Sequence, residues 1–133
     1  MASTLFDKGR EGILDVTINM TGDVRVMLVK SAYVFNAAHQ FLSDITAGND
    51  NGRSVALTTK TYAAGVFDAA DTSIVTLAAA ASNALVIFQH TGVDATARII
   101  AYIDTATGLP FTPASGQTVN QVFDNGVNKI FKL

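Results

Sequence analysis

The residue types that most often support catalysis are few in this chain, and they lie far apart. There is no cysteine, and the two histidines, His39 and His90, stand on unrelated segments. A nucleophilic enzyme needs Ser, Thr or Cys beside a base that a third group orients. Neither histidine has such neighbours, so we interpret both as solvated or backbone-bonded residues of turns.

Two acidic clusters carry the oxygen ligands that calcium prefers. One is Asp68 with Asp71, and the other is Asp50 beside Asn49 and Asn51. Neither has the spacing of an EF-hand, and Asp and Asn in turns commonly bond the local backbone. We therefore expect two turns here and no metal site.

A pair of carboxylates would be needed for sugar cleavage, and Asp104 with Asp94 or Asp124 is the pair to consider. Nothing in the sequence sets the distance between them, and capping of a turn is the simpler role for Asp104. The chain also has no Gly-rich phosphate loop, no His-Glu-x-x-His and no dinucleotide fingerprint. We expect a protein that is not an enzyme and holds no cofactor.

Composition narrows the possible partners. Nine Lys and Arg against eleven Asp and Glu give a net charge of −2, so the basic field that attracts nucleic acid is absent. No run approaches the roughly eighteen apolar residues of a membrane span, and charges near the N-terminus interrupt any signal-peptide pattern. Only 15% of residues are charged and 49% are hydrophobic, which favours burial in an assembly; an Ala- and Thr-rich monomer remains an alternative.

Strands account for most of the expected structure. β-Branched and aromatic runs of strand length occupy residues 24–30, 72–77, 84–90, 97–103, 119–123 and 127–133, with weaker candidates at 16–19, 53–60 and 62–67. Thr91-Gly-Val-Asp94 predicts a hairpin, and Asp124-Asn-Gly126 predicts a second one with a type I′ turn. About eight strands with short turns indicate a mainly β fold. We expect a single domain over residues 1–133 that folds as an antiparallel β-sandwich, and the jelly roll is one topology to consider for it.

One or two short helices are expected near the N-terminus. Residues 1–15 form a helical N-terminal segment in this prediction, because Thr4 and Asp7 fit a capping pattern. Gly9 and Gly12 weaken that helix by about 1 kcal/mol each, so it must dock on an apolar surface. A second helix is expected at residues 36–45.

The surface on which the first helix docks belongs either to its own domain or to a neighbouring protein. Its apolar residues recur on roughly one helical face. We therefore predict an interface made by Leu5, Phe6, Arg10, Ile13 and Leu14.

Several strings of residues resemble a family of small tailed-bacteriophage virion structural proteins, across almost the whole chain. The strings are Leu5-Phe-Asp-Lys-Gly-Arg-Glu-Gly12, Val24-Arg-Val-Met-Leu-Val-Lys30, Phe41-Leu-Ser-Asp44, Ala97-Arg-Ile-Ile-Ala-Tyr-Ile-Asp-Thr-Ala-Thr-Gly-Leu-Pro110 and Phe123-Asp-Asn-Gly-Val-Asn-Lys-Ile-Phe-Lys-Leu133. Many relatives carry Trp before Asp-Asn-Gly, where this chain has Phe123. That difference affects side-chain packing. The matching strings point to a family, but their residues do not indicate a catalytic mechanism.

The resemblance implies a structural role in the virion. The first expectation is a capsid decoration (cement) protein that binds the outer capsid surface and stabilises the head. Its partners would be the major capsid protein and itself, as a homotrimer, and its place would be the surface of the phage head after synthesis in the host cytoplasm. A tail component of the tube, tip or fibre is the second expectation, and a carbohydrate-binding or hydrolytic β-sandwich is the third.

Overall fold

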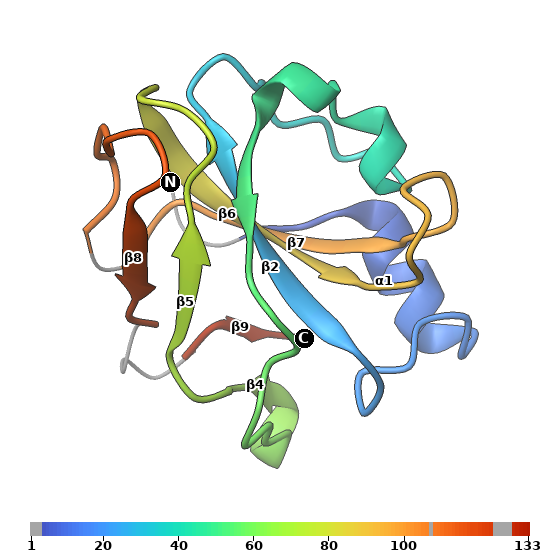
Figure 1. The fold of residues 1–133 in the computed structure, drawn as a ribbon. Helices are drawn as coiled ribbons and strands as arrows, with labels where there is room; N and C mark the ends of the chain where they lie inside the picture. The colour runs from blue at the N-terminus through green and yellow to red at the C-terminus, as the bar shows by residue number, and fades with distance from the viewer. Residues whose placement is uncertain (1–3, 107, 124–128) are drawn as a thin grey trace.

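The computed structural model describes residues 4–106, 108–123 and 129–133, which form a mainly β structure with one α-helix near the N-terminus (Figure 1). In chain order the elements are β1 (Thr4–Leu5), α1 (Asp7–Leu14), β2 (Val24–Lys30), the 3₁₀ turns η1 (Leu42–Asp44) and η2 (Ala47–Asn49), β3 (Asp50–Arg53), η3 (Ala63–Gly65), β4 (Val66–Phe67), β5 (Thr72–Val75), β6 (Ser82–Gln89), β7 (Ile99–Ile103), β8 (Thr118–Gln121) and β9 (Phe131–Lys132).

The main sheet is antiparallel and has five strands in the order β1-β7-β6-β2-β3. Its centre is the long pairing of β2 with β6, which runs from Val24 opposite Gln89 to Lys30 opposite Ser82. β6 and β7 pair as neighbours in the sequence, which confirms the hairpin predicted around residues 91–94. Two smaller antiparallel sheets, β4 with β9 and β5 with β8, complete the strands of the described residues.

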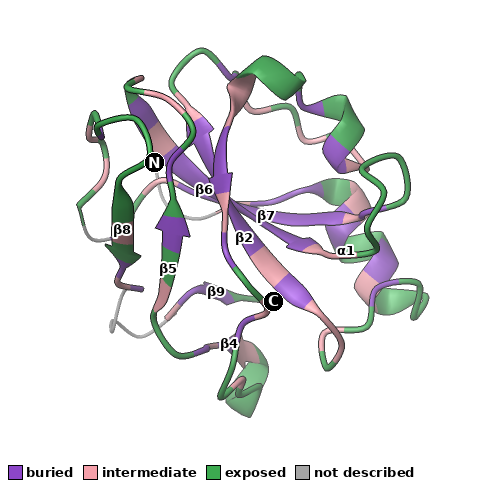
Figure 2. Cartoon of the chain, viewed as in Figure 1, coloured by how far each residue is buried: buried purple, intermediate pink, exposed green. Residues whose placement is uncertain are grey.

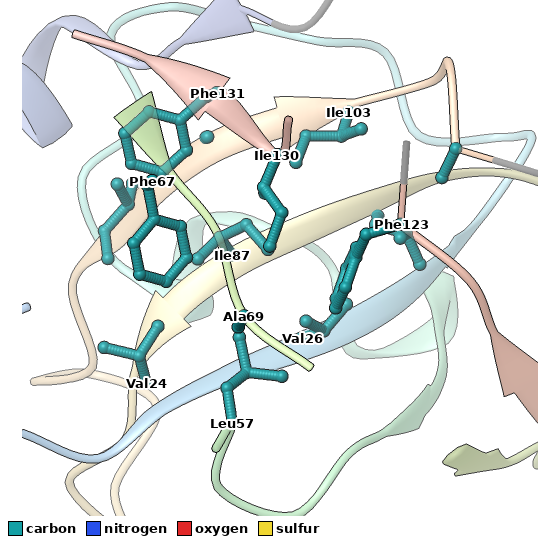
Figure 3. Close-up of a cluster of buried hydrophobic side chains, with 14 of the residues drawn as sticks. Val24, Val26, Leu57, Phe67, Ala69, Ile87, Ile103, Phe123, Ile130 and Phe131 are labelled. Atoms are coloured by element: carbon teal, nitrogen blue, oxygen red, sulfur yellow. The ribbon is translucent and has the colours of Figure 1, made fainter. Parts of the chain in front are cut away.

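Both faces of the central strands are buried. On one face Val24, Val26 and Leu28 of β2 pack in a cluster to which the small sheets contribute Phe67 and Phe131 (Figure 3). On the other face lies a second cluster, whose members include Met27, Val29, Phe6, Phe88 and Tyr33. Strand β2 alternates between two apolar environments, so its near-continuous hydrophobic run reflects burial on both sides. The chain's own core therefore accounts for part of its high apolar content.

The pairing of the last two strands differs from the prediction. Residues 119–123 and 127–133 were expected to pair with each other, but β8 pairs with β5 and β9 pairs with β4. The rings of Phe67 and Phe131 lie 5.2 Å apart, and Ile130 is buried beside them. Burial of these side chains favours pairing of β9 with β4 over pairing with β8. The predicted turn at residues 124–126 lies outside the described residues.

Two weaker expectations are also corrected. No α-helix forms over residues 36–45: the Asn36 side chain accepts from the N–H of Ala38 in a turn, and only η1 is helical. The predicted strand at residues 53–60 is displaced, because β3 occupies Asp50–Arg53. The chain beyond β3 bonds to β2 through the N–H groups of Ser54 and Leu57 and through the Ser54 hydroxyl. Local side-chain bonding in Asn- and Asp-rich segments competed with the expected regular structure.

The N-terminal helix is shorter than predicted, and it docks by close backbone contact. Thr4 and Leu5 form an edge strand on β7, so α1 begins at Asp7. A Cβ atom added to Gly9 would lie 2.4 Å from the carbonyl oxygen of Ile100. Gly9 and Gly12, which weaken an isolated helix, are the residues that let α1 approach the sheet.

We predict that Gly9→Ala destabilises the protein by about 2 kcal/mol, because the new methyl group must displace backbone atoms. Thermal unfolding followed by circular dichroism measures this change. Gly48→Ala in η2 is the matched control, since nothing lies within 4 Å of its added Cβ, and its effect should stay within about 0.5 kcal/mol. Equal stability of the two variants would contradict the role of Gly9.

Candidate interaction surface

The five residues predicted to form an interface have different surroundings in the structure. Leu5 and Phe6 are buried in the chain's own core, where the Phe6 ring centroid lies 5.0 Å from that of Phe35. Arg10 is exposed, Ile13 is half-buried, and Leu14 is 78% exposed. The part of the predicted interface that presents side chains on the surface is thus the C-terminal end of α1.

Arg98 of the segment before β7 fixes the position of that end. Its Nη2 atom donates to the carbonyl of Lys8 at 2.7 Å, and its Nη1 atom donates to the hydroxyl of Thr17 at 2.9 Å. Its guanidinium also lies over the ring of Phe41, 5.8 Å from the centroid. One side chain therefore holds both the helix and the turn that follows it.

The turn after α1 is tightly bonded and points outward (Figure 2). The carboxylate of Asp15 accepts the backbone N–H of Thr17 at 3.0 Å and its hydroxyl at 2.6 Å, and these bonds lower the pKa of Asp15. Val16, between them, is 79% exposed and has a φ of 67°. A β-branched residue is rarely found in this left-handed region.

An apolar groove of about 260 Å³, here named the α1 groove, opens beside this turn. It is lined by Ile13, Met20, Tyr62, Gly65, Val66, Phe67, Phe131 and Leu133. The hydroxyl of Tyr62 donates to the carbonyl of Met20 at 2.9 Å, which joins the two walls. Leu133 and Tyr62 are 55% and 43% exposed, so the groove continues into an apolar surface. The sequence did not indicate this groove, because its lining comes from four separate parts of the chain.

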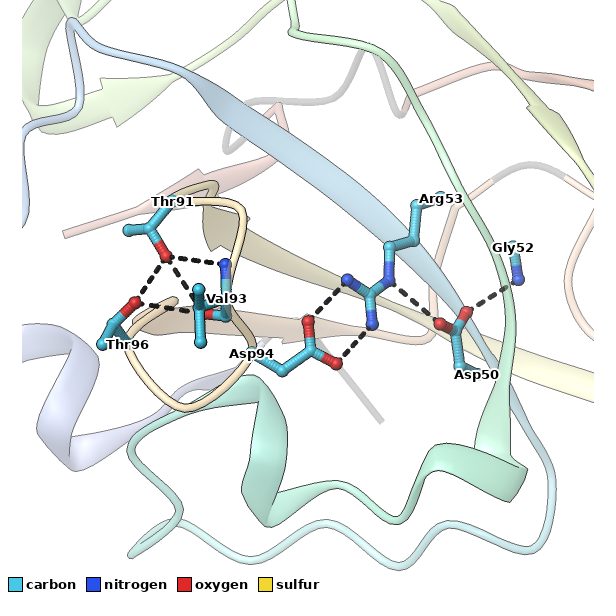
Figure 4. A network of polar contacts seen from close by, with 7 residues as sticks. All are labelled: Asp50, Gly52, Arg53, Thr91, Val93, Asp94 and Thr96. Atoms are coloured by element: carbon cyan, nitrogen blue, oxygen red, sulfur yellow. Dashed lines mark hydrogen bonds and ion pairs between the residues drawn. The ribbon is translucent and has the colours of Figure 1, made fainter.

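Three of the acidic residues considered as chemical groups, Asp50, Asp71 and Asp94, make hydrogen bonds or ion pairs within the fold. Arg53 donates both Nη atoms to Asp94 at 2.8 Å and its Nε atom to Asp50 at 2.9 Å (Figure 4). This network ties β3 to the turn between β6 and β7. The bonds from Arg53 hold the pKa of Asp94 below its usual value. The Asp71 carboxylate accepts the N–H of Phe123.

The two histidines lie in different environments. Nδ1 of His39 is 2.9 Å from the hydroxyl of Tyr33, and burial raises the pKa of Tyr33 to about 12. The His90 ring meets the edge of Phe88, while its backbone N–H donates to the carbonyl of Asp23.

No possible metal centre appears among residues 4–106, 108–123 and 129–133, where no three His, Cys, Asp or Glu side chains gather. An open hollow of about 550 Å³ lies between residues 55–58 and the β5–β8 sheet. Asp71 is the one ionisable group in its lining, and its carboxylate is already engaged. Asp104 follows β7, and Asp124 lies outside the described residues.

The fold and this surface define a mainly β protein with an exposed apolar end. A scan against protein families finds no match, and neither curated proteins nor solved structures provide a significant relative. Within the described residues no helix has both the length and the apolar character needed to cross a bilayer.

We predict that Asp94→Asn lowers the stability by about 1 kcal/mol at neutral pH, because a partly exposed bidentate ion pair is lost. The pKa of Asp94 is lower in the folded state than in the unfolded state. The carboxylate therefore contributes its full stabilisation at pH values above the unfolded-state pKa of about 3.9. This stabilisation is lost as the pH falls through the pKa that Asp94 has in the folded state. Urea unfolding of both proteins between about pH 7 and about pH 2 measures this difference.

The control for this prediction is the same substitution in an Arg53→Gln background, where Asp94→Asn should have little further effect. A stability difference that stays constant down to the lowest pH would contradict an ionic origin.

Proposed function

We propose that this chain is a structural protein of a tailed-bacteriophage virion, and in particular a decoration protein that binds the outer surface of the capsid and stabilises the head. The observation that carries the proposal is the exposed apolar surface at the end of α1, where Leu14, Val16 and the α1 groove meet. Exposed apolar surface of this kind marks sites of protein association. The resemblance of the sequence to small phage virion proteins, over nearly all of the chain, indicates the kind of assembly.

The low charge of the chain supports the same proposal. Only 15% of its residues are charged, and five ion pairs are found among the described residues, which engage Arg10, Arg25, Arg53 and Lys8 with acidic neighbours. Charged side chains are therefore scarcer on this chain than on an average soluble domain. A protein that buries part of its surface in a shell needs fewer of them.

We further propose that the architecture is a β-sandwich. One layer would be the five-stranded sheet, and the other would be the two small sheets that cover the face formed by Val24, Val26 and Leu28. The shared hydrophobic cluster between these layers supports this arrangement (Figure 3). The jelly-roll form stays a prediction.

The decoration role predicts binding to heads and stabilisation of heads. The purified chain is added to heads and, separately, to tails from the phage that encodes it, and each mixture is sedimented and imaged by electron microscopy. We expect the chain to pellet with heads, to occupy symmetric positions on their surface, and to raise the temperature at which they release DNA. Buried interface area opposes the pressure of the packaged genome in this proposal.

Heads of an unrelated phage are the control and should not bind the chain. Binding to tails or the formation of rings, together with no binding to heads, would reject the decoration role in favour of a tail component.

A further inference from the structure

Strand β8 has one edge whose backbone groups are unpaired. Next to its pairing with β5, Thr76 donates its N–H to the carbonyl of Gln117, so the backbone of Val119, two residues further on, also bonds toward β5. The backbone groups of Thr118 and Asn120 point to the opposite edge, because bonding alternates along an antiparallel strand. Within the described part of the chain neither residue has a hydrogen-bond partner for its N–H or its C=O.

This edge is accessible from outside. Thr118 and Asn120 are exposed, and most of β8 lies on the surface (Figure 2). A hollow of about 230 Å³ opens beside the strand, and its lining consists of Gly108, Phe111, Gln117, Val119 and Gln121. An approaching strand therefore meets open space along β8.

The free edge also lacks the features that normally prevent two strand edges from pairing. Such features are charged side chains, proline within the strand and bulges. Residues 105–123 contain no Asp, Glu, Lys or Arg, and β8 itself contains no proline. Its register with β5 is continuous, without a bulge. An edge of this kind is a template for another strand.

Other edge strands of the described structure are protected. β3 carries Asp50 and Arg53, which are held in an ion-pair network (Figure 4), and its Asn51 carbonyl already accepts the N–H of Leu77. β9 includes Lys132. Charges on an edge oppose its pairing with an identical edge, because like charges would meet. The contrast makes β8 the edge best suited to pair with a copy of itself.

The unpaired groups define the chemistry of the occupant. Donors and acceptors that alternate at this spacing are matched by an extended polypeptide strand. In the antiparallel orientation the edge of β8 is its own complement, because Thr118 of one copy then lies opposite Asn120 of the other. Each N–H meets a C=O in this register, and no charged side chain opposes the contact. A second copy of the chain therefore matches this edge.

We propose that two copies of the chain pair through β8 in antiparallel orientation about a two-fold axis, so that two β5–β8 sheets join into one continuous sheet. Thr118 and Asn120 exchange two N–H···O bonds with their counterparts at each of the two pairs, and Val119 meets its own equivalent at the axis. This contact goes beyond the proposed function and does not depend on it, since it would form in any assembly that leaves the edge free.

Sedimentation equilibrium of the full chain tests the contact and its register. A small interface binds weakly, so concentrations up to about 1 mM are measured, and we expect a dimer mass to appear. The double variant Thr118→Lys with Asn120→Lys places lysine opposite lysine at both pairs. We expect its dissociation constant to rise at least about tenfold.

The matched control changes the same two residues to Thr118→Glu with Asn120→Lys. Opposite charges then meet at both pairs, so this variant should associate at least as well as the wild-type chain. Both positions are exposed in the monomer, and circular dichroism should show that both double variants remain folded.

Cross-linking tests the residue at the axis, and it is simple because the chain has no cysteine. Val119→Cys is oxidised mildly, and the products are identified by mass spectrometry. We expect a disulfide-linked dimer, because residues opposite each other without hydrogen bonds have Cβ atoms about 4.5 Å apart. Val75→Cys on β5 is the control. Val75 is 55% exposed, so random collisions would cross-link it readily, whereas the proposed contact does not bring it to its equivalent.

Four results would overturn the proposal. They are a monomeric mass up to the highest concentration, a trimeric mass, equal association of the two double variants, and cross-linking of Val119→Cys no faster than that of Val75→Cys. A monomer that binds heads would reject this contact and leave the decoration role standing. A dimer that does not bind heads would do the reverse, so the two failures are distinguishable.

Discussion

The close approach of α1 to β7 determines the arrangement of the whole N-terminal end. Gly9 lies against the backbone carbonyl of Ile100 at a separation that leaves no space for a side chain, whereas Gly12 lies against the side chains of Ile18 and Arg98. Arg98 then bonds the helix and the following turn to the sheet. With the helix held at this depth, Phe6 enters the core and Leu14 is left outside. The burial of one residue and the exposure of the other are two results of a single backbone contact.

The central strands were predictable because their pattern is strong and local. The range of β2 agrees with the prediction at both ends, and side chains from its two faces lie in two apolar clusters. The β6–β7 hairpin also followed from β-branched runs around a turn. In these strands, the preference of β-branched and aromatic residues for β-structure and the burial of their side chains favour the same structure.

The peripheral strands were harder to predict, because burial decided their partners. The Asn-Gly signal favoured a local hairpin, whereas Phe131 packs on Phe67 from the middle of the chain. The α1 groove was equally hard to predict, since Ile13, Tyr62 and Leu133 are far apart in the sequence and come together only in the folded protein. A periodic pattern could suggest that Leu5, Phe6, Ile13 and Leu14 share a face. It could not show that the first two enter the core.

The pairing of β4 with β9 and of β5 with β8 has a consequence for how the protein forms. Each pair joins segments separated by at least forty residues, and β1 at the start of the described chain pairs with β7. Closing such long loops costs chain entropy before any buried contact compensates for it, so folds of this kind form slowly. On the ribosome, the apolar faces of β2 and β6 are synthesised well before β9 exists to cover one of them. The nascent chain therefore exposes its most hydrophobic strands during synthesis, and early contact with chaperones would protect it from aggregation.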